Sequence, residues 1–71
     1  MWSKGTLNGY EFWTKHFEEG SDYGINGSGR ISKLTIRKDG KELYNFDRGL
    51  DFDNLDQGGK AIYAELLERY N

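Results

Sequence analysis

Basic residues interleaved with aromatic ones are the clearest candidate for chemistry in this chain. Between residues 30 and 48, six cations stand against three acids, so this segment carries a net charge of +3. Lysine and arginine neutralise phosphates, and aromatic rings stack on exposed bases for about 1–3 kcal/mol each. An ordinary solvated sheet surface would show a similar mixture. We predict a single-stranded nucleic-acid interface made of Trp13, Arg30, Lys33, Arg37, Lys38, Lys41 and Tyr44.

Four aspartates precede the C-terminal segment and form a second candidate site: Asp47, Asp51, Asp53 and Asp56. Clustered carboxylates can hold Mg²⁺ for phosphodiester cleavage. Helix capping and solubility explain the same residues, and the spacing does not match a calcium-binding loop. A weak metal-dependent nickase using the first three aspartates is therefore a hypothesis, but we assign no catalytic residue, metal or cofactor.

The single histidine and the glycine-rich segment favour structural roles. His16 has no second histidine or cysteine to share a metal with. Residues 24–30 could present N–H groups to a phosphate, but no Lys-Ser/Thr follows and the next element is a strand. We expect residues 19–29 to form a turn-rich cover with Tyr23 and Ile25 turned inward.

Turn signals predict two β-hairpins. Asn8-Gly9 is typical of a two-residue turn, which would pair Leu7 with Tyr10. In the strand that follows, alternation puts Trp13 on the face opposite Tyr10 and Phe12.

Asp39-Gly40 joins the strands of the second hairpin, 30–38 and 41–47. A two-residue turn would pair Arg37 with Glu42. We favour a three-residue turn that pairs Leu34 with Tyr44, because it gathers the apolar side chains of both strands on one face.

From Leu55 onward the apolar period becomes helical. We expect Asp53 or Asn54 to cap the helix and Gly59 to approach the sheet. The predicted fold is α+β: a four-stranded antiparallel sheet of two hairpins with one C-terminal helix, in a single domain covering residues 1–71. On folding, so short a chain buries only about 60% of the surface that its unfolded form exposes. We therefore expect homo-oligomerisation through the helix residues Ile62, Tyr63, Leu66, Leu67 and Tyr70.

Composition excludes several classes of protein. The chain has 71 residues, no cysteine and no proline, a net charge of −2 and a mean hydropathy of −0.90. A disulfide scaffold is impossible without cysteine, and no run approaches the roughly 20 apolar residues of a membrane span. The N-terminus lacks the apolar run of a signal peptide. We expect a cytoplasmic protein that does not bind membranes.

Several segments resemble a family of small uncharacterised proteins from bacteria, phages and mobile elements. The most specific are Tyr23-Gly24-Ile25-Asn26-Gly27, Gly29-Arg30-Ile31-Ser32-Lys33-Leu34 and Asn45-Phe46-Asp47-Arg48-Gly49. Two departures are Leu50, where a tryptophan is expected, and the inserted Ser28. The family has no settled activity, so this resemblance implies context more than function.

The expected order of elements, ββββα, also looks like the PC4-type single-stranded DNA-binding fold, by analogy of architecture only. That fold usually dimerises through its helix and binds DNA on a curved sheet. The resemblance implies a non-enzymatic nucleic-acid-binding module. The alternative is a protein-binding inhibitor of a host or defence nuclease, of the anti-CRISPR type.

Overall fold

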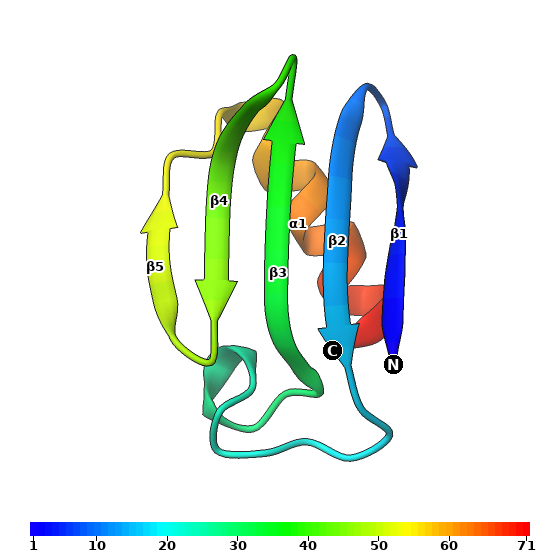
Figure 1. Cartoon of the computed structure of the whole chain (residues 1–71), viewed down its shortest axis with the longest axis vertical. Coiled ribbons are helices and arrows are strands. Elements are labelled where there is room, and N and C mark those ends of the chain that lie inside the picture. Colours follow the sequence, from blue (N-terminus) through cyan, green and yellow to red (C-terminus); the bar gives the residue numbers. More distant parts are fainter.

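A five-stranded antiparallel sheet with one helix across it makes up the chain, and the computed structural model describes all 71 residues (Figure 1). The elements are β1 (Trp2–Leu7), β2 (Tyr10–His16), η1 (Ile25–Gly27), β3 (Ile31–Lys38), β4 (Lys41–Asp47), β5 (Leu50–Asp53) and α1 (Gln57–Tyr70). Neighbouring strands in the sheet are neighbours in sequence. The α+β class and the C-terminal helix are confirmed, whereas the predicted number of four strands is wrong. The single α-helix is neither long nor apolar enough to cross a membrane.

The additional strand, β5, lies between the second hairpin and the helix, outside the four predicted strands. A tight turn precedes it: Arg48 has φ 58°, and the Asp47 amide donates to the Gly49 carbonyl at 2.9 Å. Tyr44 and Asp53 are partners in the ladder between β4 and β5. Residues 50–53 alternate apolar and acidic side chains, which is the period of a strand, but four residues are too few to stand out.

The first hairpin forms as predicted, with Leu7 opposite Tyr10 and positive φ at Asn8 and Gly9. The second hairpin has a two-residue turn, so the favoured three-residue turn is wrong. Its ladder shifts between Ile36 and Arg37, and this bulge brings Ile36 opposite Tyr44. The bulge thus restores the shared apolar face that the longer turn was expected to provide.

Helix α1 begins two residues later than predicted. Asp56, and neither Asp53 nor Asn54, is the N-cap residue: its Oδ1 accepts from the Gly59 amide at 2.7 Å and from the Tyr10 hydroxyl at 2.6 Å. The Tyr10 hydroxyl and the Gly59 amide both lower the pKa of the Asp56 carboxyl. The late start follows from β5, which keeps the chain extended as far as Asp53.

Gly58, and not Gly59, is the helix glycine that closely approaches the sheet. A Cβ atom at Gly58 would lie 2.6 Å from the Tyr10 Oη atom. A Cβ at Gly59 would instead meet Leu55 and the capping carboxylate of Asp56.

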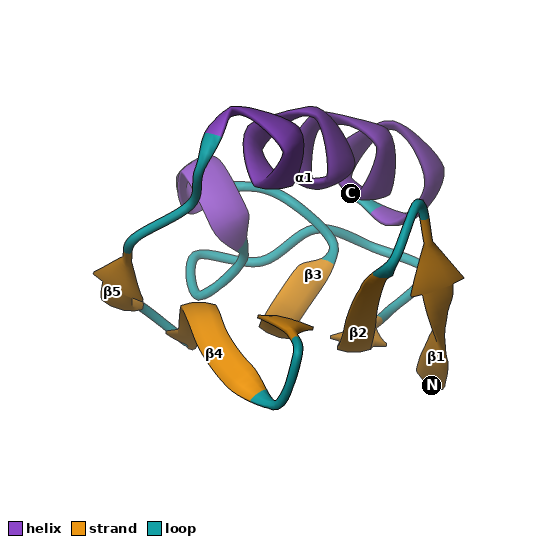
Figure 2. Cartoon of the chain, turned by 90° about the horizontal axis from the view of Figure 1, so that it is seen from above, coloured by secondary structure: helices purple, strands orange, loops and turns teal.

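The core lies between the helix and one face of the sheet (Figure 2). Its buried members are Tyr10, Phe12, Ile25, Ile31, Leu34, Ile36, Tyr44, Phe46, Leu55, Ile62 and Leu66. Tyr63, Leu67 and Tyr70 are partly buried against this cluster. The helix stripe thus covers the chain's own sheet, and self-association through it stays a prediction.

His16 packs at the edge of this core. Its ring centroid lies 4.7 Å from that of Tyr70, and its Nε2 atom is 2.9 Å from Ser3 Oγ. Burial lowers the pKa of the imidazole, with smaller contributions from the N-terminal amino group and Arg30. These contacts describe a structural histidine.

Replacing Leu66, whose side chain is fully buried, tests the core. Leu66→Ala should lower the free energy of unfolding by about 2–5 kcal/mol, because it removes apolar contacts and leaves a cavity. Urea denaturation measures this change. The exposed substitution Glu68→Ala on the same helix should stay within about 0.5 kcal/mol of wild type. Equal losses in both variants would contradict the assigned core.

Stability should depend on pH through His16. The unfolded chain takes up this proton near pH 6.5, whereas the folded chain takes it up at lower pH. The contribution is therefore complete above about pH 6.5 and is lost as the pH falls below it. Urea midpoints at about pH 7.5 and about pH 5.5 should differ more for the wild type than for His16→Gln. Identical pH dependence in the two proteins would contradict this role.

Candidate nucleic-acid interface

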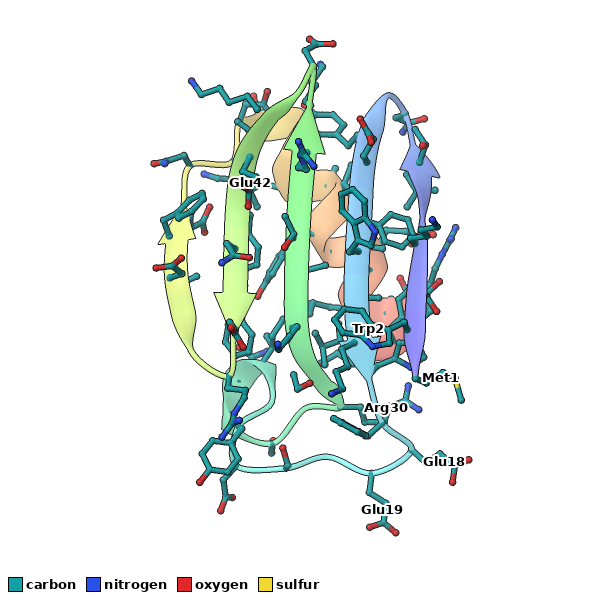
Figure 3. The ribbon with its side chains drawn as sticks, in the orientation of Figure 1. Met1, Trp2, Glu18, Glu19, Arg30 and Glu42 are labelled. Carbon is teal, nitrogen blue, oxygen red and sulfur yellow. The ribbon has the colours of Figure 1, made fainter.

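The sheet face opposite the helix has no covering element, and we call it the open face (Figure 2). Three large aromatic residues are exposed here: Trp2 (60%), Trp13 (36%) and Phe17 (46%). Figure 3 shows Trp2 lying across the front of the strands. The solvent face of an antiparallel sheet is normally polar, so rings gathered on one face indicate a contact surface.

Cations lie against these rings. The Lys15 Nζ atom is 5.7 Å from the Trp2 ring centroid and 5.5 Å from that of Phe17. The Arg37 guanidinium lies 5.5 Å from the Trp13 ring centroid. Lys33 is the partner of Lys15 in the ladder between β2 and β3. Rings and positive charges therefore alternate over β1, β2 and β3.

Carboxylates of the chain neutralise little of this charge. The only ion pair on the open face joins Lys33 Nζ to Asp47 Oδ1 at 3.7 Å, and both side chains are exposed. Arg37 lies between Glu11 and Glu42 in the ladders but forms an ion pair with neither. Its Nε atom has no hydrogen-bond partner. An exposed pair contributes only about 0–1 kcal/mol, so a phosphate can compete for Lys33.

The predicted interface residues divide between the two faces of the sheet. Trp13, Lys33 and Arg37 share the open face. Tyr44 is only 3% exposed, with its ring centroid 5.0 Å from that of Tyr63, so it is not available for stacking. Burial is also the main cause that raises the pKa of its hydroxyl.

The other three predicted cations also lie apart from the open face. The Lys38 Nζ atom lies 4.6 Å from the Tyr10 ring centroid, on the helix side of the sheet. Lys41 is the ladder partner of Lys38 across the hairpin turn. The Arg30 Nε atom donates to the C-terminal Asn71 carbonyl at 3.3 Å.

The predicted interface omits Trp2, Lys15, Phe17 and Arg48, which lie among these exposed rings and cations. Three of them could have been found from the sequence. Alternation puts Lys15 and Phe17 on the same face as Trp13. Trp2 follows from the first hairpin, in which it pairs with Lys15. Arg48 gives no such signal, because its position depends on a turn and on the fold of a distant loop.

The glycine-rich loop is a cover, as expected, and not a phosphate nest. The amides of Ser21, Gly24, Gly27 and Gly29 all donate to carbonyls inside the loop. Asn71 fastens it: its Oδ1 accepts from the Ile31 amide at 3.1 Å, and its side chain occupies the space that a Cβ at Gly29 would need.

Ile25 turns inward as predicted, but Tyr23 does not. The Tyr23 side chain is 58% exposed, and the Arg48 guanidinium lies 5.2 Å from its ring centroid. Ring and cation stand together at the end of the open face nearest the loop.

A depression of about 260 Å³ lies at this end of the face, and we call it the terminal pocket. Residues of β2, the loop, β3 and the turn before β5 line it: Lys15, Phe17, Ser21, Tyr23, Ser32, Lys33 and Arg48. Three of the seven are cations and none is acidic. This is the most basic part of the open face.

The predicted aspartate cluster does not form. Asp47 pairs with Lys33, Asp51 accepts from the Asn45 amide, and Asp53 accepts from the Leu55 amide. Asp56 caps the helix. No group of three or more acidic, histidine or cysteine residues could hold a metal ion. The strands separate aspartates that lie close in sequence.

The fold and site define a small α+β domain whose sheet is covered on one face and carries exposed rings and cations on the other. The chain belongs to the family described as Domain of unknown function (DUF7678), whose model matches residues 1–71. This agrees with the expected relation to an uncharacterised family. No curated protein and no solved structure shows significant similarity to the chain.

Proposed function

We propose that this protein binds single-stranded nucleic acid on the open face of β1, β2 and β3. One observation carries the proposal: exposed Trp2, Trp13 and Phe17 alternate with cations on a face that nothing covers. Rings provide stacking platforms and cations follow the phosphates, which is how proteins bind single strands without reading sequence.

Single strands suit this face better than duplexes. Bases in a duplex are stacked on one another, so exposed rings gain nothing from them. A five-stranded sheet face also presents no helix or narrow ribbon to a groove. Preference for single strands is therefore expected, with little dependence on base sequence.

The overall charge of −2 restricts where a strand can lie. On the open face, Glu11 lies on β2 beside Arg37. Other acids lie on the β4 and β5 side of the sheet, at Glu42, Asp47 and Asp51, and on the helix, at Glu65 and Glu68. Favourable potential is thus limited to the part of the open face that lies away from Glu11 and from the acids of β4 and β5. Binding should be moderate in strength and should weaken as salt screens the cations.

The analogy to PC4-type proteins fits this proposal in part. An antiparallel sheet with one helix and one free face is common to both, although this chain has an additional strand. Such an analogy concerns the fold alone. A phage or mobile-element setting and a homo-oligomeric state belong to the same proposal.

A protein-binding inhibitor is the second candidate. Tryptophan, tyrosine and arginine dominate the energetics of protein interfaces, and Trp2, Trp13, Tyr23 and Arg48 are of these types. This candidate predicts a stable complex with a partner protein and no affinity for nucleic acid.

Binding is tested by fluorescence anisotropy with labelled single-stranded and duplex oligonucleotides that end in hydroxyls. We expect salt-dependent binding that prefers single strands. Trp13→Ala should weaken it about 5- to 150-fold, since stacking on one ring contributes about 1–3 kcal/mol. Absence of single-strand binding even at low salt would reject the proposal and favour a protein partner.

Charge reversal tests which face binds. Lys15→Glu and Arg37→Glu should each weaken binding of a single strand and reduce its salt dependence by about one phosphate contact. Lys60→Glu makes the same change in charge on the exposed surface of α1 and is the matched control. Equal losses in all three variants would mean that net charge, and not the open face, determines affinity.

A further inference from the structure

We propose that the terminal pocket binds a phosphate monoester carried by a nucleoside. This phosphate monoester belongs either to the phosphorylated end of a nucleic-acid strand or to a free mononucleotide. Binding of a strand end rests on the proposed function, whereas binding of a free mononucleotide does not.

Charge in the pocket favours a monoester over the diester of a strand interior. Lys15, Lys33 and Arg48 line it, and the only carboxylate paired with any of them is that of Asp47. A phosphate monoester carries about −1.5 to −2 charges at pH 7, whereas a backbone diester carries one. Three cations around one depression exceed what a single diester needs.

Hydroxyls and rings complete the recognition of a nucleotide. Ser21 and Ser32 line the pocket beside the cations. The Ser32 hydroxyl donates to the Lys15 carbonyl at 3.4 Å, whereas Ser21 Oγ accepts from the Tyr23 amide at 3.3 Å and keeps its own hydrogen for a phosphate oxygen. Phe17 and Tyr23 are half exposed there and offer faces for a base. The volume of about 260 Å³ lies just below the range of drug-sized ligand sites, roughly 300–1,000 Å³, so the pocket can take a small ligand or one end of a larger one.

The turn before β5 fixes the position of Arg48. Its φ of 58° is in the left-handed region, where an arginine is strained and a glycine is not. The Arg48 amide donates to the Ser32 carbonyl at 2.8 Å, which holds this conformation. This conformation belongs to the tight turn before β5, and the hairpin turns at Asn8 and Asp39 also have positive φ. Here it directs a cation, backed by Tyr23, into the pocket.

The pocket also lies where a strand on the open face would end. Lys15 and Lys33 lie at the ends of β2 and β3 next to the loop, and Ser21 and Tyr23 form the far side. No acid of the loop, Asp22 included, lines the pocket, and Glu18 and Glu19 point away from the sheet in Figure 3. An end group is therefore the part of a strand that fits.

The first experiment is an NMR titration of ¹⁵N-labelled protein with a nucleoside monophosphate, the nucleoside alone and inorganic phosphate. We expect the monophosphate to shift signals of pocket residues and to bind about tenfold more tightly than the nucleoside, because charge-assisted hydrogen bonds are strong. Shifts scattered over the surface, or equal binding of nucleoside and monophosphate, would overturn the proposal for free nucleotides.

The second experiment uses anisotropy with strands of one sequence bearing a 5′-phosphate, a 3′-phosphate or hydroxyls only. One phosphorylated strand should bind about tenfold more tightly than the hydroxyl strand. Arg48→Gly should remove this gain and keep the fold, because glycine accepts the same backbone conformation. Lys60→Gln also removes one cation, but outside the pocket, and should keep the gain.

The outcomes separate this inference from the proposed function. Hydroxyl and phosphorylated strands that bind equally well would overturn binding of strand ends and leave the open-face interface standing. A mononucleotide bound in the pocket without any binding of strands would support the pocket and reject the interface. No binding in either experiment would overturn both.

Discussion

One helix packed against one face of a sheet is the constraint on which the rest of this structure depends. Ile62 and Leu66 bury their side chains against the sheet, and no second layer exists in 71 residues to cover the other face. Two tryptophans are nevertheless in that uncovered face. The Trp2 ring lies beside Lys15, and the Trp13 ring lies beside Arg37. A cation against a ring stabilises an exposed aromatic side chain, and the same cation can attract an anionic ligand.

Both ends of the helix are tied to the sheet, and these ties also position the candidate site. At the start, Asp56 joins the helix amides to the Tyr10 hydroxyl on β2. At the end, Asn71 bonds to the Ile31 amide and packs against Gly29. The second tie holds the loop against the end of the sheet. The loop supplies Ser21 and Tyr23 to the terminal pocket, so the contacts of Asn71 after the helix help to form the pocket, although no helix residue lines it.

Local features of this fold could be predicted from the sequence, whereas features set by distant contacts could not. Asn8-Gly9 determines its own turn, and alternation alone divides Trp13 from Phe12. The second hairpin combines a two-residue turn with an apolar face shared by both of its strands. The pairing that this turn sets would separate Ile36 from Tyr44, and the bulge opposite Ile36 brings the two together. Burial of Tyr44 and exposure of Tyr23 depend on where the helix and the Arg48 turn lie, which no short segment encodes.

Charge shows why the interface could not be found by counting along the chain. The segment 30–48 has a net charge of +3, but its strands alternate, so Arg37 faces the open side while Lys38 faces the helix side. Lys15 comes from a segment that is acidic overall, yet it lies on the open face against the rings of Trp2 and Phe17. A net charge of −2 is compatible with an anion-binding face, because what a ligand meets is the arrangement of charges on one surface and not their sum.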